Sequence, residues 1–224
     1  MTDDPRWLER VLGYRFADEE LLQRALTHRS AGGRHNERLE YLGDAALSLV
    51  VAEALYQRLP DAPEGHLSRL RASLVRRSSL AETARQLGFP ERLRLGPGEL
   101  KSGGFRRESI LADALEAVLG AIYLDGGLEA LRPVVLRFYG DRLDDLPGHE
   151  SLKDPKTLLQ ERLQARGLPL PAYRVEAVEG EDHRQHFTVA CSVEGVAMEA
   201  TGRGSSRRGA EQAAASRMLA QIDA

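Results

Sequence analysis

Three acidic side chains recur along one side of the segment formed by residues 36–59. At 100° per residue, Glu37, Glu40 and Asp44 fall within about 60° of one another on a helix. A solvated acidic face is the ordinary explanation of such spacing. Here, however, apolar residues continue the same stripe and also cover the opposite side, as in a buried helix. Carboxylates at the end of a buried stripe are costly unless a cation meets them, so the pattern favours a cation site.

A second segment, residues 109–124, repeats this arrangement. Asp113 and Glu116 are three residues apart, and Gly120 follows on the same face, where it is expected to leave room beside them. Two buried helices of this kind could bring four to five carboxylates together. Oxygen ligands at that density suit a hard cation, Mg²⁺ or its substitute Mn²⁺, better than zinc. Because carboxylate-bound Mg²⁺ typically acts on phosphate esters, the sequence predicts a metal-dependent phosphoesterase.

Other chemistries lack their motifs. A di-iron carboxylate bundle needs Glu-x-x-His on two helices, and neither acidic segment supplies it. The sequence contains neither Gly-x-Ser-x-Gly nor a phosphate loop. His28, His35 and His66 match no ligand spacing and are expected to cap helices or lie at the surface. No small-molecule cofactor is therefore expected.

A helical scaffold must position these acids. Asp18 is expected to cap a first helix, with Glu19 and Glu20 in its first turn. Gly- and Pro-containing loops at residues 60–65 and 96–104 separate the later helices. The expected later helices cover residues 36–59, 67–75, 80–87, 109–124 and 128–143.

The pattern changes after a polar stretch that contains Pro147 and Gly148. Alternating apolar residues predict three strands, followed by an alanine-rich helix. The fold class is therefore an all-α N-terminal domain (residues 1–146), a linker (147–153) and a small α+β domain of order α-β-β-β-α (154–224). The expected elements of this last domain are helix 154–166, strands 173–177, 187–193 and 196–200, and helix 207–222.

Composition sets limits without naming a function. The 31 basic and 34 acidic side chains give a net charge of −3, which by itself does not indicate a nucleic-acid-binding protein. No apolar run approaches the length of a membrane span, and the N-terminus lacks the pattern of a signal peptide. The lone Cys191 cannot form an internal disulfide. We therefore expect a cytoplasmic protein with no membrane partner.

Residues 36–44, Asn-Glu-Arg-Leu-Glu-Tyr-Leu-Gly-Asp, resemble the signature helix of the ribonuclease III family. Residues 96–99 and 106–117 also resemble that family, its bacterial members especially. The likeness runs from about residue 5 to the C-terminus. It implies an endoribonuclease that acts on double-stranded RNA.

The resemblance also assigns roles to individual acids. It implies that Glu40, Asp44, Asp113 and Glu116 are the Mg²⁺ ligands and catalytic core. Glu37 and Glu64 match two further acidic positions at the family's cleavage site, with supportive roles. Glu64 has a second explanation, since an acid that opens a helix after Pro63 stabilises the helix dipole equally well.

The C-terminal domain resembles the double-stranded RNA-binding domain that follows the nuclease in this family. Such domains read the shape of A-form RNA more than its sequence. Thr157, Gln160 and Glu161 share one helix face, where polar side chains can meet 2′-hydroxyls, although a solvated face is an equal explanation of the spacing. His183, in the first hairpin, resembles a second minor-groove contact.

Residues 202–208, Gly-Arg-Gly-Ser-Ser-Arg-Arg, give the strongest anion-binding signal in the chain. A flexible loop, hydroxyls, the amides of a helix N-terminus and guanidinium groups would form a phosphate clamp there. Gly209 and Glu211 stand where the wider domain pattern often has basic residues, so we expect a weaker affinity for phosphate. The clamp residues are Ser205, Ser206, Arg207 and Arg208.

The leading hypothesis is an Mg²⁺-dependent endoribonuclease that leaves 5′-phosphate and 3′-hydroxyl ends. The resemblance further implies a homodimer that cuts opposite strands, short 3′ overhangs, and a role in rRNA and mRNA precursor processing. Self-association also fits the helical domain, whose apolar faces exceed what its short helices can bury.

Two alternatives and one open role remain at the level of sequence. The chain could be a non-catalytic double-stranded RNA-binding protein whose nuclease-like domain is only a scaffold, although such a protein has no reason to keep buried charge. It could instead hydrolyse small phosphate esters, which leaves the C-terminal domain unexplained. Arg106 and Arg107 either hold the scissile strand or pair with nearby carboxylates.

Overall fold

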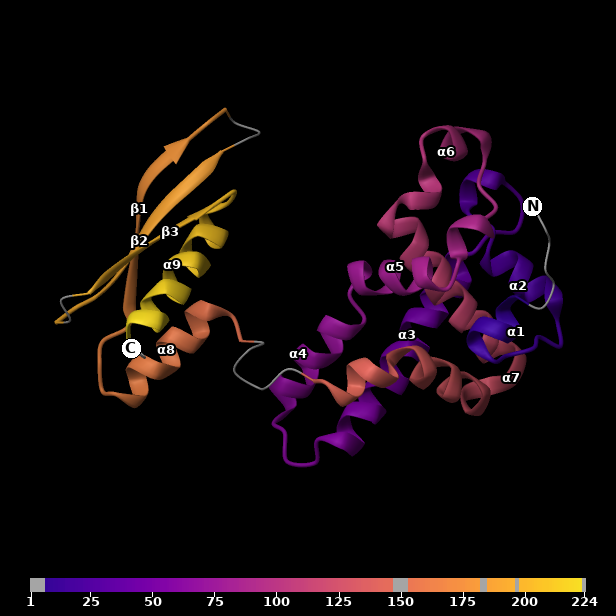
Figure 1. Cartoon of the computed structure of the whole chain (residues 1–224), viewed down its shortest axis with the longest axis horizontal. Coiled ribbons are helices and arrows are strands. Elements are labelled where there is room, and N and C mark those ends of the chain that lie inside the picture. The colour runs from indigo at the N-terminus through magenta and orange to yellow at the C-terminus, as the bar shows by residue number, and fades with distance from the viewer. Residues whose placement is uncertain (1–6, 147–152, 182–184, 196–197, 223–224) are drawn as a thin grey trace. The chain divides into compact units, whose positions relative to one another are not determined.

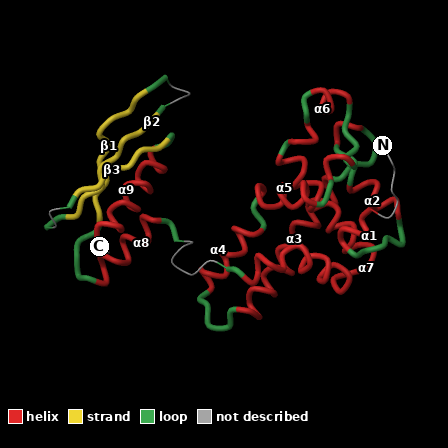
Figure 2. The backbone as a smooth tube through the Cα atoms, viewed as in Figure 1, coloured by secondary structure: helices red, strands yellow, loops and turns green. Residues whose placement is uncertain are grey.

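The computed structural model describes residues 7–146, 153–181, 185–195 and 198–222. The chain divides into two compact units, Met1–Pro147 and Gly148–Ala224. The first unit is helical, and the second combines two helices with a sheet (Figures 1 and 2). The expected fold class, all-α followed by α-β-β-β-α, is confirmed. The expected linker lies almost wholly outside the described residues.

Helix α2 of the helical unit begins at the cap that the sequence predicts. The carboxylate of Asp18 accepts a hydrogen bond from the Glu20 amide at 2.9 Å and thereby caps α2. Asn36 is the N-cap residue of the long helix α3. In chain order the helices are α1 (Trp7–Leu12), α2 (Glu19–Ala25), the 3-10 helix η1 (Arg29–Ala31), α3 (Glu37–Arg58), α4 (Glu64–Leu74), α5 (Arg77–Gln86), the 3-10 helix η2 (Phe89–Glu91), α6 (Pro97–Lys101), the 3-10 helix η3 (Gly104–Arg106) and α7 (Glu108–Asp144).

Helix α7 contains both of the helices that were expected over residues 109–124 and 128–143. They meet at Gly127, whose φ of 75° lies in the left-handed region and interrupts the helical backbone. The first half of α7 is wholly buried at Leu111, Leu115 and Leu119. It therefore forms the centre of the helical core.

Helices α3 and α7 pack backbone against backbone. A Cβ atom on Gly43 of α3 would overlap the carbonyl oxygen of Glu116, and one on Gly120 of α7 would overlap the carbonyl oxygen of Leu39. The expectation that Gly120 leaves room beside the acids was therefore wrong. The backbone of α3 occupies that space, because the absence of both side chains lets the two helices touch.

The second unit is a three-stranded antiparallel sheet with strand order β1-β2-β3 and two helices. Its core contains Cys191, fully buried on β2 beside Leu159 and Met218. Cys191 is therefore a core residue. The elements are α8 (Pro155–Ala165), β1 (Pro171–Glu179), β2 (His186–Val193), β3 (Glu199–Gly204) and α9 (Arg207–Ile222).

The third strand extends further along the chain than its alternation suggested. It covers Glu199–Gly204, so residues 202–204, expected as a flexible loop, are strand. Residues 196 and 197 of the expected strand 196–200 lie outside the described residues. A Cβ atom on Gly202 would overlap the backbone nitrogen of Ala214, and one on Gly204 would lie 2.6 Å from that of Ala210. These glycines let α9 approach the sheet, and their missing side chains erased the alternating pattern.

Among the described residues, none of the helices combines the length and the apolar character that crossing a bilayer requires.

Candidate active site

The contact between α3 and α7 brings three carboxylates together. Glu40 of α3 and Asp113 and Glu116 of α7 each offer an oxygen, and these oxygens lie within 4.8 Å of one another. Gly43 lies one turn after Glu40, and Gly120 one turn after Glu116. The close approach of the two backbones therefore occurs beside the acids and sets their separation.

Burial and mutual repulsion make this cluster costly when it carries no cation. Burial, followed by the charges of Asp44, Asp113 and Glu40, raises the pKa of Glu116 to about 8. Burial also raises the pKa of Asp113. The pKa of Glu40 is raised by burial and by the negative charges of Asp113 and Glu37. A set of oxygen donors that repel one another in this way fits a hard divalent cation, whose charge would offset the repulsion.

Two of the other acids on α3 lie around this cluster. Asp44 is exposed and falls outside the group of three, but its charge is the second cause of the raised pKa of Glu116. Glu37 is exposed and pairs with Arg29 at 3.3 Å and with the His35 ring at 3.7 Å. The structure thus places both at the border of the three acids.

Glu64 does not join the acids within this chain. It begins α4, which follows the C-terminal end of α3, and the 18-residue step from Glu40 to Arg58 spans about 27 Å of helix. Its carboxylate accepts a hydrogen bond from the Ser68 hydroxyl at 2.6 Å. The described contacts of Glu64 are those of an acid in a first helical turn.

A cavity of about 340 Å³ opens beside the acids, and Glu40 and Asp113 form part of its wall. Arg107 lines it and pairs with Glu99 at 3.1 Å. Arg106 is exposed and lies over the Phe105 ring at 5.0 Å. Arg107 is thus paired with a carboxylate and also faces the cavity, whereas Arg106 contacts an aromatic ring.

Sequence reasoning did not identify two residues near this site. The charge of Arg77, the first residue of α5, lowers the pKa values of Glu40, Asp113 and Glu116. Asn36 is 2% exposed and lines the cavity, and its Nδ2 has no hydrogen-bond partner among the described residues. The position of Arg77 near the acids follows only from the packing of α5 against α7. Asn36, in contrast, lies within the signature segment of residues 36–44, but no role was assigned to it from the sequence.

The second unit has a groove of about 620 Å³ where the N-terminal ends of α8 and α9 meet. It contains four of the residues that were expected to contact RNA: Thr157, Gln160, Arg207 and Arg208. The Ser206 hydroxyl accepts a hydrogen bond from the Gly209 amide at 3.1 Å and caps α9. Of the remaining candidates, Ser205 is exposed in the turn before α9, Glu161 pairs with Lys153, and His183 lies outside the described residues.

Comparison with known proteins covers both units. The family described as Ribonuclease-III-like matches residues 18–143, and the Double-stranded RNA binding motif matches residues 155–222. Ribonuclease 3 of Vibrio vulnificus (strain YJ016) is 57% identical over 215 residues, which cover 96% of each chain. Ribonuclease 3 of Vibrio cholerae is 56% identical over 222 residues, which cover 99% of each.

Two solved structures resemble the helical unit. The nuclease domain of ribonuclease III from Campylobacter jejuni has 41% identity and a TM-score of 0.61, over 66% of this chain and 100% of that one. A second structure of that domain has 43% identity and a TM-score of 0.60, over 62% of this chain and 97% of that one. It is described as showing structural flexibility in a region involved in dimer formation.

Proposed function

Because the chain belongs to the ribonuclease-III-like family, we propose that it is an Mg²⁺-dependent endonuclease of double-stranded RNA. The observation that carries the proposal is the convergence of Glu40, Asp113 and Glu116 from two packed helices. The double-stranded RNA binding motif over residues 155–222 supports the choice of substrate. Structured precursors of rRNA and mRNA are the substrates we propose, and the single Cys191 supports a cytoplasmic location.

The three converging acids, with Asp44 beside them, would hold the cation. A Mg²⁺ ion held there, or Mn²⁺ in its place, supplies activation of water and stabilisation of the leaving 3′-oxygen, which yields 5′-phosphate and 3′-hydroxyl ends. Arg77 offsets part of the negative charge. The Arg107 guanidinium lines the adjoining cavity and is placed to donate hydrogen bonds to the RNA backbone.

The incubation of a long RNA duplex with the full chain tests this function. With Mg²⁺ we expect short products with 5′-phosphates on a denaturing gel, and with Ca²⁺ in its place we expect none. A duplex that is retarded but uncut with both metals would favour the non-catalytic RNA-binding protein. A chain that neither binds nor cuts the duplex would exclude both functions.

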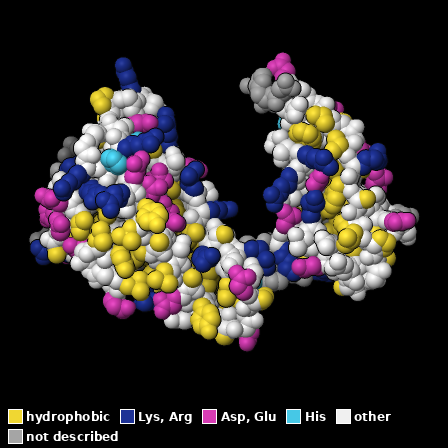
Figure 3. All heavy atoms as spheres, turned by 180° about the vertical axis from the view of Figure 1, so that it is seen from behind, with side chains coloured by type: hydrophobic (Ala, Val, Ile, Leu, Met, Phe, Trp, Pro, Cys, Tyr) yellow, Lys and Arg dark blue, Asp and Glu magenta, His cyan; other side chains and the backbone are white. Residues whose placement is uncertain are grey.

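We further propose that the protein is a homodimer joined through α3. Tyr41, Leu49 and Tyr56 lie within about 80° of one another on this helix and are 82%, 54% and 72% exposed. One face of the helical unit shows a broad apolar area bordered by acidic and basic side chains (Figure 3). Asp44 lies about 60° from Tyr41 on α3, so a partner on this stripe would shield Asp44 from water.

Tyr41→Glu is expected to convert the dimer into a monomer, because it places a charge in an apolar interface. We expect association to weaken at least about 100-fold, measured by sedimentation equilibrium at micromolar concentration. Leu100→Glu, at a half-exposed position on α6, is the matched control and should leave the mass unchanged. A monomeric wild-type chain, or a dimeric Tyr41→Glu variant, would contradict the proposed interface.

A further inference from the structure

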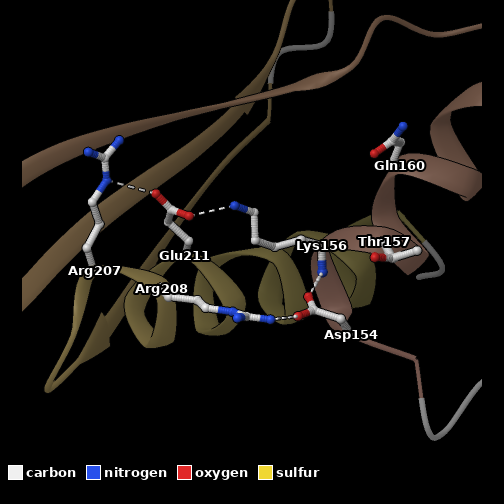
Figure 4. A pocket seen from close by; sticks show the side chains of 7 residues that line it. All are labelled: Asp154, Lys156, Thr157, Gln160, Arg207, Arg208 and Glu211. Atoms are coloured by element: carbon white, nitrogen blue, oxygen red, sulfur yellow. Dashed lines mark hydrogen bonds and ion pairs between the residues drawn. The ribbon is translucent and has the colours of Figure 1, made fainter. Parts of the chain in front are cut away.

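Basic side chains of the second unit meet carboxylates where RNA phosphates are expected to bind. Figure 4 shows Lys156, Arg207 and Arg208 around the groove between α8 and α9, with Asp154 and Glu211 among them. Both carboxylates point toward the basic groups and not away into solvent. The groove is therefore less positive than its arginines and lysine alone would make it.

Glu211 binds two of these cations at once. One oxygen of its carboxylate accepts a hydrogen bond from the Lys156 ammonium at 2.5 Å, and the other accepts one from Arg207 Nε at 3.0 Å. Only 12% of its side chain is exposed. The hydrogen bond from Lys156 is the main reason that the pKa of Glu211 is lowered, so the carboxylate is charged at neutral pH.

Asp154 has a structural reason to be acidic, and Glu211 does not. Asp154 caps α8 by accepting a hydrogen bond from the Lys156 amide at 2.9 Å, and it also binds Gln212 at 2.6 Å and pairs with Arg208 at 3.6 Å. Glu211 caps no helix. Its pairing with Arg207 at i, i+4 is worth only a few tenths of a kcal/mol on a helix surface, and with the basic residue first it has the weaker orientation.

We propose that Glu211 is an internal competitor for RNA phosphates, which sets a moderate affinity for duplexes and speeds the release of cleaved product. In the free protein it holds Lys156 and Arg207. When a duplex enters the groove, phosphates take over these two cations, and the carboxylate must give them up. The inference rests on the proposed binding of double-stranded RNA, and it assigns Glu211 a positioning role through the two cations.

Competition between Glu211 and the RNA phosphates should change how the binding constant for the duplex depends on salt concentration. Added salt screens the ion pairs of Glu211 with Lys156 and Arg207, as it screens the phosphate contacts that replace them. The cost of breaking the Glu211 pairs therefore falls as salt rises, which offsets part of the salt dependence of RNA binding. Neutralisation of Glu211 should remove this offset and make the slope of log K against log[salt] more negative, by up to about 0.9, the contribution of one phosphate contact.

The test measures binding of the full chain to an RNA duplex without divalent metal, at several salt concentrations, by fluorescence anisotropy. Glu211→Gln keeps the shape of the side chain and removes its charge. We expect about tenfold tighter binding near 0.1 M salt and the steeper slope. Glu199→Gln is the matched control, because it removes the same charge from the same unit, where Glu199 pairs with Arg174 at 3.4 Å, outside the groove.

A second test with Mg²⁺ measures the release of cleaved product. Under substrate excess, Glu211→Gln should turn over several-fold more slowly than the wild type, because the product leaves later. The ratio of the multiple-turnover rate to the single-turnover rate, measured for each protein, should therefore be lower for Glu211→Gln. If Glu211 only stabilised the packing of α8 against α9, Glu211→Gln would instead have a lower Tm and would bind the duplex more weakly.

The outcomes separate the two proposals. Duplex binding by the wild type, with equal or weaker binding by a folded Glu211→Gln variant, overturns the role of Glu211 alone. A wild-type chain that binds no duplex overturns this role together with the proposed function. If Glu211→Gln does not fold, Glu211→Ala is measured by the same slope and judged by the same outcomes.

Discussion

Glu116→Gln should abolish cleavage of double-stranded RNA while it leaves duplex binding almost unchanged. The amide keeps the size of the side chain but removes one of three converging charges that would hold the cation. We expect the single-turnover rate with Mg²⁺ to fall at least about 1000-fold, which corresponds to about 4 kcal/mol of activation free energy. The Kd for the duplex should stay within about twofold, because the groove that we propose to bind RNA lies in the other unit.

The matched control for this variant is Glu129→Gln. Glu129 also lies on α7, but its side chain is 88% exposed and pairs with Arg132. Its substitution should leave cleavage at the wild-type rate. Normal cleavage by Glu116→Gln would show that the converging acids are not the catalytic site.

Glu116→Gln should also change how the thermal stability of the metal-free protein depends on pH. The pKa of Glu116 is raised to about 8, so the folded state binds this proton more tightly than the unfolded state does. Its contribution to stability is complete below the ordinary pKa of about 4.5 and is lost as the pH rises toward 8. Thermal melts in EDTA should therefore show a Tm that falls between pH 5 and 8 in wild type and falls less in Glu116→Gln. Added Mg²⁺ should raise the Tm of wild type more than that of the variant.

Gly43→Ala should unfold or severely destabilise the helical unit. The new methyl group would overlap the carbonyl oxygen of Glu116, a backbone atom that cannot rotate away. Helices α3 and α7 would have to separate along their central contact, at a cost of about 3 kcal/mol or more. For a chain of this size, that lowers the Tm by roughly 6–12 °C in a thermal melt.

Gly140→Ala is the control, since Gly140 lies on α7, the helix that packs against α3, and a Cβ there meets nothing within 4 Å. Replacing a helical glycine by alanine at such a position should raise stability by about 0.5–1 kcal/mol. If Gly43→Ala melted at the wild-type temperature, the backbone contact between α3 and α7 would not be essential to this fold.

Local sequence pattern was sufficient for most of the secondary structure. The helices over residues 36–59, 109–124 and 128–143 were predicted because their apolar residues repeat at the helical period. Asp18 lies at the start of helix α2, where its carboxylate accepts a hydrogen bond from the Glu20 amide, a short-range contact that the sequence predicts. The same local logic placed β2 and buried Cys191, since strand alternation depends only on neighbouring residues.

Local pattern failed where glycine stands for a contact with another element. Gly202 and Gly204 looked like a loop, yet they form the end of β3, because α9 leaves no room for a side chain there. Gly120 looked like open space, yet α3 fills it. A glycine in the sequence shows that a side chain is absent, but it does not show which atoms lie in its place.

The acids show the same division. By itself the sequence determined which acids lie on which helix faces, because that depends only on the residue spacing within each helix. The tertiary structure decided that Glu40 meets Asp113 and Glu116, that Arg77 lies near them, and that Glu211 faces Lys156. These pairings depend on how separate elements pack, and helical and strand periodicity carries no information about distances between elements.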